Sequence, residues 1–284
     1  MPRVGIMQGR LVPPQPGSIQ CFPRDRWRDE FALAADAGIQ AIEWIDDVHG
    51  ADVNPLATDA GIEEMQALSR EHGVAVVSLC ADYFLDRPIV RASPAGIADL
   101  TARLNWLITR CGLAGITRVV LPFVDAARID TTADVQRLVD VVAGVRGACE
   151  ATGIELHLET ALAPHAFARV LDRVPDPWVR VNYDSGNSAS LGYDVTRELA
   201  AYGERIGSVH IKDRVSGGST VPLGSGDADL PTLLAGLTRL GYQGDYVLQV
   251  ARGADGQEVE WARHNLLLLV HALDRAHSTT ERQC

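Results

Sequence analysis

Four short hydrophobic segments of this chain each end in a side chain that can bind a metal ion. The segments span residues 154–159, 178–184, 206–210 and 244–249, and they end in Glu159, Asp184, His210 and Gln249. The four end residues lie about 25 to 40 positions apart, roughly the length of one strand, loop and helix. Because parallel strands in a closed barrel direct their C-terminal ends to one region, residues far apart in sequence can meet there. The spacing therefore predicts a site for a divalent cation such as Mn²⁺, Co²⁺ or Mg²⁺, built from oxygen and imidazole donors.

The rest of the chain follows the same alternation of strands and helices. Short β-branched runs predict eight strands, at residues 4–8, 39–45, 74–80, 117–123, 154–159, 179–184, 207–211 and 246–250. Gly38, Gly73, Gly153 and Gly241 come ahead of strands, where glycine accepts the left-handed conformation that ends a helix. The 284 residues suit one (β/α)₈ barrel, which takes roughly 250 residues. We therefore predict an α/β protein with a single (β/α)₈ barrel domain over residues 1–284, in which residues 274–284 form a flexible polar tail.

An open, doubly wound sheet would show the same alternation. Its nucleotide-binding form needs a glycine triplet after the first strand, and residues 5–11 lack one. In a barrel, function belongs to the loops that follow the strands. Those loops carry Gln8, Glu43, Asp82 and His165, which we take as candidate substrate contacts.

The charge balance limits the partners of this chain. A formal net charge of −11 argues against nonspecific binding to nucleic acid or to an anionic membrane, because attraction to phosphate supplies most of that affinity. No apolar run is long enough to cross a bilayer, and the N-terminus enters a strand without a charged and apolar leader. The five cysteines lack paired short spacing and are expected to be free thiols. We therefore expect a cytoplasmic protein whose partner is a small molecule.

Each candidate ligand also has a purely structural interpretation. Glu159 could cap a helix or form a surface salt bridge, but in a barrel the alternation along its strand directs it inward, where a carboxylate needs compensation. His157 shares that orientation one layer deeper and is better explained as a core or supporting residue than as a ligand. Asp184 precedes Ser-Gly-Asn, which is an ordinary turn sequence. His210 lies among apolar residues and needs a buried polar partner, so the joint pattern carries the argument.

Several motifs together resemble one family. They are LHLE ending at Glu159, DSGN from Asp184, VHIKD around His210, and the glycine-rich VPLGSGDAD at residues 221–229. With MQGR at residues 7–10 and IEWI at residues 42–45, the likeness covers nearly the whole chain. The sequence resembles the sugar phosphate isomerase/epimerase family, whose fold is the xylose isomerase-like TIM barrel. Its second half is most similar to ketopentulose-phosphate 3-epimerases and hexulose-phosphate isomerases.

The resemblance implies a metal site with catalytic glutamates. In that family a glutamate, an aspartate, a histidine and a second glutamate from successive strands bind one divalent ion, and the glutamates flank the carbon that exchanges a proton. The first three match Glu159, Asp184 and His210, which implies that Glu159 is the base and that His210 also belongs to the catalytic site. The fourth position is Gln249, whose amide offers an oxygen to a metal but takes no proton at neutral pH. Because epimerisation needs acid–base groups on both faces of an enediolate, this departure favours aldose–ketose isomerisation or dehydration. Epimerisation would need another base, for which His165, His157, Asp82 and Glu43 are candidates.

Cationic residues near the strand ends are candidates to stabilise oxyanions or a phosphate. They are Lys212, Arg214, Arg252 and Arg10, although a surface charge is the simpler explanation of each. The glycines of residues 222–231 could bring backbone N–H groups to an anion, but Asp229 as a helix N-cap explains this segment structurally. The resemblance is compatible with a homodimer or homotetramer, and no residue pattern decides between them.

We consider four functions for such a barrel. The first is a metal-dependent isomerase or epimerase of a sugar or sugar phosphate, acting through an enediolate. The second is a dehydratase or lyase of an inosose-like cyclitol on the same metal site. The third, an endonuclease for abasic DNA, needs three zinc ions and a basic face, and the acidic balance argues against it. The fourth is a sugar-binding barrel that has lost catalysis at Gln249.

Overall fold

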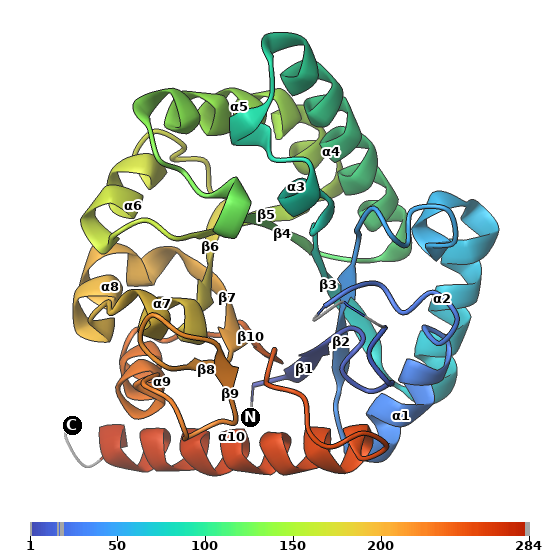
Figure 1. The fold of residues 1–284 in the computed structure, drawn as a ribbon, viewed down its shortest axis with the longest axis vertical. Helices are drawn as coiled ribbons and strands as arrows, with labels where there is room; N and C mark the ends of the chain where they lie inside the picture. The colour runs from blue at the N-terminus through green and yellow to red at the C-terminus, as the bar shows by residue number, and fades with distance from the viewer. Residues whose placement is uncertain (1, 16, 18–19, 282–284) are drawn as a thin grey trace.

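Eight parallel strands close into a barrel at the centre of the molecule. The computed structural model describes residues 2–15, 17 and 20–281. The barrel strands are β1 (Val4–Met7), β2 (Ala41–Ile45), β3 (Ala75–Cys80), β4 (Arg118–Phe123), β5 (Glu155–Thr160), β6 (Val179–Asp184), β7 (Ile206–Ile211) and β10 (Asp245–Leu248). They pair in chain order, and β10 pairs back with β1. Figure 1 looks along the barrel and shows the helices around it. The predicted (β/α)₈ barrel is confirmed.

The strand bounds agree with the sequence prediction to about two residues at each end, which is the usual uncertainty of such bounds. Glycine accounts for much of this agreement. Gly38, Gly73 and Gly153 end the preceding helices with φ of 78°, 66° and 71°, a conformation that costs other residues more. Each of these helices therefore stops shortly before the next strand begins.

The helices form an outer layer around the barrel. The larger ones are α1 (Asp29–Ala37), α2 (Asp59–His72), α4 (Pro94–Ala114), α5 (Thr132–Thr152), α6 (Pro164–Leu171), α8 (Val195–Tyr202), α9 (Leu230–Arg239) and α10 (Glu258–Glu281). Two short helices follow strands closely: α7 (Ser185–Leu191) starts directly after β6, and α3 (Tyr83–Asp86) starts shortly after β3. Helix starts use the expected caps, since Thr131 and Asp134 form a capping box at α5.

Two long connections lie on the face where the strands have their C-terminal ends. One joins β1 to α1 through residues 8–28, and the other joins β7 to α9 through residues 212–229. The second contains a small antiparallel hairpin of β8 (Asp213–Arg214) and β9 (Thr220–Val221). Part of this connection is therefore ordered as a two-stranded ribbon, which lies beside α7 (Figure 1).

Apolar side chains fill the space between the strands and the helices. An aromatic group around Trp44 is the most compact part, with Phe22, Trp27 and Phe31 at ring-centroid distances of 5.8, 5.7 and 6.1 Å. All four side chains are almost completely buried. Because Phe22 and Trp27 belong to the first long connection, this packing anchors that connection to β2.

The structure also bears on the predictions for the C-terminal segment, the cysteines and membrane spans. Helix α10 runs to Glu281, so most of the segment predicted as a flexible tail is helical, and residues 282–284 lie outside the described residues. Cys21, Cys80, Cys111 and Cys149 are buried free thiols, and Cys284 lies outside the described residues. Among the helices described, none is long and apolar enough to pass through a bilayer.

Candidate metal centre and active site

Three of the four predicted ligands meet at the C-terminal end of the barrel. Glu159 on β5, Asp184 at the end of β6 and His210 on β7 each offer one ligand atom, and these atoms lie within 4.8 Å of one another. The three side chains are buried. Two carboxylates and an imidazole are a common donor set for Mn²⁺, Co²⁺, Zn²⁺ and related divalent ions. The predicted convergence is therefore present, and the donor set fits such an ion.

Asp184 combines the two roles that its sequence context suggested. Its Oδ1 accepts a hydrogen bond from the backbone N–H of Asn187 at 2.8 Å and so caps α7. Its Oδ2 lies 3.9 Å from Nδ1 of His210, on the side of the ligand group. The turn-forming role fixes the carboxylate with one oxygen toward the helix, which leaves the other oxygen facing the candidate metal site.

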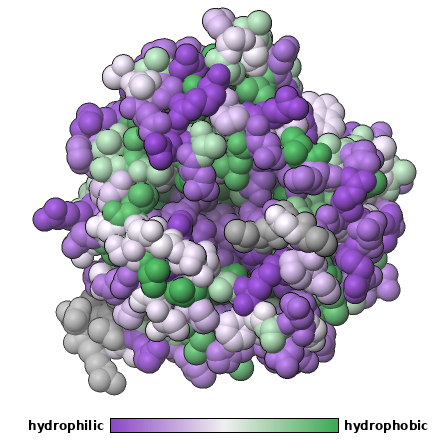
Figure 2. Space-filling model, viewed as in Figure 1, coloured by the Kyte–Doolittle hydropathy of each residue, from purple (hydrophilic) through white to green (hydrophobic). Residues whose placement is uncertain are grey.

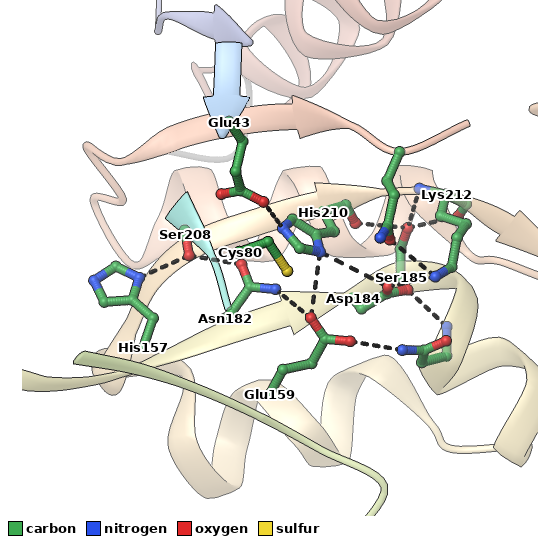
Figure 3. Close-up of polar contacts among 12 residues, drawn as sticks. Glu43, Cys80, His157, Glu159, Asn182, Asp184, Ser185, Ser208, His210 and Lys212 are labelled. Carbon is green, nitrogen blue, oxygen red and sulfur yellow. Dashed lines mark hydrogen bonds and ion pairs between the residues drawn. The ribbon is translucent and has the colours of Figure 1, made fainter. Parts of the chain in front are cut away.

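His210 is held from behind by a buried carboxylate. Its Nε2 lies 2.6 Å from Oε1 of Glu43, and its Nδ1 lies 3.3 Å from Oε2 of Glu159 without forming a hydrogen bond of ordinary geometry (Figure 3). Burial alone would lower the pKa of His210, but the carboxylates of Glu43 and Glu159 outweigh burial and raise it. A cation bound at Nδ1 would take the place of the proton there.

Glu43 was predicted to contact substrate, and the structure places it elsewhere. Its side chain is fully buried behind His210, and Ser78 donates a second hydrogen bond to it. Burial favours the neutral acid, yet His210 and Ser78 outweigh it and lower the pKa of Glu43. Glu43 therefore orients the imidazole so that Nδ1 faces the ligand group, as carboxylates behind metal-binding histidines commonly do.

Gln249, the fourth predicted ligand, forms hydrogen bonds with two other side chains. Its Oε1 accepts a hydrogen bond from Nζ of Lys212 at 2.9 Å, and its Nε2 donates to Oε1 of Gln20 at 3.1 Å. The same Lys212 ammonium lies 2.7 Å from Oδ2 of Asp184. The Lys212 ammonium thus bridges Asp184 and Gln249, the second and fourth predicted ligands.

The chain matches a known family over most of its length. A family model described as the xylose isomerase-like TIM barrel matches residues 31–270. The chain belongs to this family. The resemblance inferred from its motifs is confirmed at that level.

Named relatives of this xylose isomerase-like barrel include sugar epimerases. The L-ribulose-5-phosphate 3-epimerase UlaE of Salmonella paratyphi C is 36% identical over 76 residues, which are 26% of this chain and 27% of that protein. The corresponding enzyme of Escherichia coli ATCC 8739 gives the same identity and coverage. The matched segments therefore span less than a third of these curated relatives.

Solved structures extend the likeness of the fold to the whole barrel. A structure of L-ribulose 3-epimerase has a TM-score of 0.76 and 20% identity, covering 99% of this chain and 97% of that one. D-psicose 3-epimerase from Clostridium cellulolyticum H10, solved with D-tagatose, has a TM-score of 0.75 and 17% identity, covering 95% and 99%. IolI, solved with a zinc atom, has a TM-score of 0.73 and 16% identity, covering 96% and 99%.

Two asparagines hold Glu159 in this xylose isomerase-like barrel. Asn182 Nδ2 donates to Oε2 of Glu159 at 2.7 Å, and Asn187 Nδ2 donates to Oε1 at 2.8 Å. Both carboxylate oxygens are therefore fixed by neutral donors, which orient the group without adding charge. The sequence predicted no role for either residue, although Asn187 belongs to the DSGN motif. An asparagine inside a strand, such as Asn182, does not indicate which side chain it will contact.

A chain of hydrogen bonds continues from Asn182 into the barrel interior. Ser208 Oγ donates to Oδ1 of Asn182 at 2.6 Å and lies 2.7 Å from Nδ1 of His157. Nε2 of His157 lies 2.9 Å from Oε2 of Glu155, whose side chain is 46% exposed. Figure 3 shows the part of this chain from His157 to Glu159. His157 is thus the supporting residue that the sequence suggested.

A cavity of about 580 Å³ opens above the candidate metal centre. Of the predicted residues, Glu159, Asp82, Lys212, Arg214 and Gln249 line it. Arg10, which was also predicted as a candidate cation, and Gln20 line it from the β1–α1 connection. The space is large enough for a monosaccharide, and it gives direct access to Glu159.

Besides Glu43, three more predicted substrate contacts lie away from this cavity. Gln8 is fully buried and accepts a hydrogen bond from the backbone of Ile45 at 2.9 Å. His165 is exposed in the first turn of α6, because the helix begins at Pro164 and carries it into the outer layer. Arg252 donates to carbonyl oxygens of the β1–α1 connection at 2.6 and 3.0 Å, so it fastens two loops together.

Proposed function

We propose that this protein is a divalent-metal-dependent isomerase or epimerase of a sugar or sugar phosphate, with Glu159 as the base. The observation that supports this most is the meeting of Glu159, Asp184 and His210 at the C-terminal end of the barrel, where Glu159 lines an open cavity. The family membership and the sugar epimerases among the relatives agree with it. We expect a small polyhydroxylated substrate and no nucleic acid.

Glu159, Asp184 and His210 would hold the ion, and the amide oxygen of Gln249 would be available as a further ligand. A bound divalent ion would polarise a substrate carbonyl and its neighbouring hydroxyl, which lowers the pKa of the proton between them. The donor set accepts Mn²⁺, Co²⁺, Mg²⁺ or Zn²⁺.

Glu159 is suited to move the proton. Asn182 and Asn187 fix both of its oxygens, and its carboxylate lines the cavity. It would take the proton from the carbon next to the carbonyl and return it to the neighbouring carbon on the same face. Gln249 supplies no base on the opposite face, so a proton shift between adjacent carbons fits this site better than inversion at one carbon.

The absence of a carboxylate at position 249 also favours a second candidate, dehydration of a cyclitol of the inosose type. Removal of a proton by Glu159 would be shared by both reactions. They differ in whether a hydroxide leaves from the carbon beyond, and therefore in product mass. A dehydration product is lighter by one water, whereas isomerisation conserves mass.

The test is incubation of the Mn²⁺-loaded protein in D₂O with ketoses, aldoses, their phosphates and inososes. We expect deuterium at a carbon next to the carbonyl, and loss of this exchange in Glu159→Gln. Mass spectrometry of the product then separates isomerase from dehydratase. Tight binding of one metal ion without exchange in any substrate would contradict the proposal and favour a binding protein.

A further inference from the structure

The glycine-rich loop that could have received a phosphate is filled by the protein itself. Backbone N–H groups of Gly224 and Gly226 donate to Oδ2 of Asp213 at 2.8 and 2.9 Å, and that of Ala228 donates to Oδ1 at 3.0 Å. Asp213 is buried. A Cβ on Gly226 would lie 2.3 Å from Oδ1 of Asp213, so the loop is closely fitted to this carboxylate. The backbone donors that bind anions in such loops are therefore already used.

The cations that line the cavity are also engaged. Arg214 donates to Oδ1 of Asn187 at 2.9 Å and to a carbonyl oxygen of its own hairpin at 2.7 and 3.1 Å. Arg10 donates to Oε1 of Gln20 at 3.2 Å. Lys212 contacts the carboxylate and the amide of the metal centre. A phosphate would therefore share these cations with the partners that they already have.

The opposite wall of the cavity carries carboxylates. Asp82, Asp86 and Asp125 line it, on the β3 and β4 side. Asp82 is buried, and burial raises its pKa to about 6 even though Gln20 and Cys80 donate hydrogen bonds to it. The side chains of Asp86 and Asp125 make no hydrogen bond or ion pair with any described residue and are exposed to the cavity.

Asp125 has a further property that marks this wall. Its backbone has a φ of 50°, and among the described residues it is the one non-glycine residue with a positive φ. Such a conformation costs free energy unless the surroundings hold it, and it is concentrated at functional sites. Figure 2 shows that the hollow at the mouth of the barrel is lined mainly by hydrophilic residues.

From these contacts we infer that the substrate is a neutral polyhydroxylated compound, a free sugar or cyclitol, and not a phosphate ester. The inference rests on the proposed function, because it concerns the substrate of the same site. A phosphate monoester carries close to two negative charges at neutral pH. Among the described residues it would face the free carboxylates of Asp86 and Asp125, together with cations that already have other partners. Hydroxyl groups instead donate to carboxylates and need no cation.

The experiment compares matched pairs with the Mn²⁺-loaded protein. Each pair is a ketose and its terminal phosphate, for example L-ribulose with L-ribulose 5-phosphate and D-fructose with D-fructose 6-phosphate. Solvent deuterium uptake gives kcat/KM for each member. We expect the neutral member of at least one pair to exchange with a kcat/KM at least about tenfold above its phosphate.

A charge variant tests the wall itself. The double variant Asp86→Asn and Asp125→Asn removes two negative charges while it keeps side-chain size, and asparagine tolerates the positive φ at position 125. We expect the double variant to lower the ratio of kcat/KM for the neutral compound to kcat/KM for its phosphate by at least about threefold. The control, Glu63→Gln with Asp99→Asn, removes two exposed charges elsewhere and should leave the preference unchanged.

The outcomes separate this inference from the proposed function. Faster exchange of the phosphate in every pair would overturn the inference and leave the proposed function standing. If no member of any pair exchanges, and no aldose or inosose of the first test does either, the proposed function fails, and calorimetric binding of the same pairs decides the inference. Tighter binding of the phosphates, or no binding by either member, would then overturn it, and tighter binding of the neutral compounds would support it.

Discussion

Glu43 and His210 lie 167 residues apart in the chain, and Oε1 of Glu43 is 2.6 Å from Nε2 of His210. Both side chains are fully buried. This contact decides which nitrogen of the imidazole remains for a metal, because Nε2 is occupied and Nδ1 faces Glu159 and Asp184. The orientation of the candidate metal centre therefore depends on a strand from the opposite half of the chain.

Replacing Glu43 by glutamine should weaken metal binding. The variant loses the charge behind His210, which lowers the basicity of Nδ1 and loosens the ring, and such partners typically change affinity by about 10- to 100-fold. Titration calorimetry with Mn²⁺ measures the change. Glu63→Gln, on an exposed face, is the matched control. An unchanged dissociation constant for Glu43→Gln would mean that His210 is not a ligand or needs no support.

Replacing Gln249 by glutamate should tighten metal binding by about tenfold or more, because it adds a negative charge to the ligand group. It also places a base on a second side of the cavity, so we expect inversion at one carbon to appear or increase. Chromatography of epimers from one ketose measures this gain. Gln249→Ala, which loses the amide oxygen and adds no charge, should show neither effect. If alanine and glutamate behave alike, position 249 lies outside the reaction.

Replacing Ser208 by alanine should interrupt the chain between Asn182 and His157. Both would lose a buried hydrogen bond, and we expect a loss of about 1 to 3 kcal/mol in the free energy of unfolding. Because Asn182 orients Glu159, we also expect kcat to fall while KM changes little. Denaturant titration and steady-state kinetics measure the two effects, with Ser69→Ala on α2 as control. A loss of stability with an unchanged kcat would mean that these hydrogen bonds stabilise the fold and do not contribute to catalysis.

The buried carboxyl group of Glu30 should lower the free energy of unfolding as the pH rises. Burial raises the pKa of Glu30 from 4.5 to about 8, although the backbone N–H of Gly9 donates to it at 2.7 Å. Between these values the folded state binds more protons than the unfolded state, so this group costs stability as pH rises through that window. Glu30→Gln stays neutral, and its stability relative to the unaltered protein should be greater at pH 8.5 than at pH 5.5. Thermal unfolding at both values measures this.

The same comparison with Glu63→Gln controls for loss of a charge alone. That side chain is exposed, so its stability difference from the unaltered protein should be similar at the two pH values. A pH-independent difference for Glu30→Gln would show that Glu30 is ionised in the folded protein throughout this range.

The barrel could be predicted from the sequence because its units are local. Each strand is a short β-branched run, and glycines such as Gly38 and Gly153 end the helices close to where the next strands begin. The meeting of Glu159, Asp184 and His210 could be predicted for a related reason. Parallel strands place their C-terminal ends on one face of a barrel, so position within the strand decides where the side chain lies.

The partners of the polar side chains were decided only by the tertiary structure. Gln8, Glu43 and Arg252 have residue types that bind substrates, yet their hydrogen bonds go to Ile45, His210 and loop carbonyls. Asp213 shows the same limit over a short distance, since its sequence neighbours did not reveal that it fills the glycine-rich loop. A hydrogen bond reaches only about 3 Å and goes to whichever group folding brings near. Strand periodicity therefore determined the barrel and the face that carries the metal ligands, and the closed barrel determined which polar groups remain for a substrate.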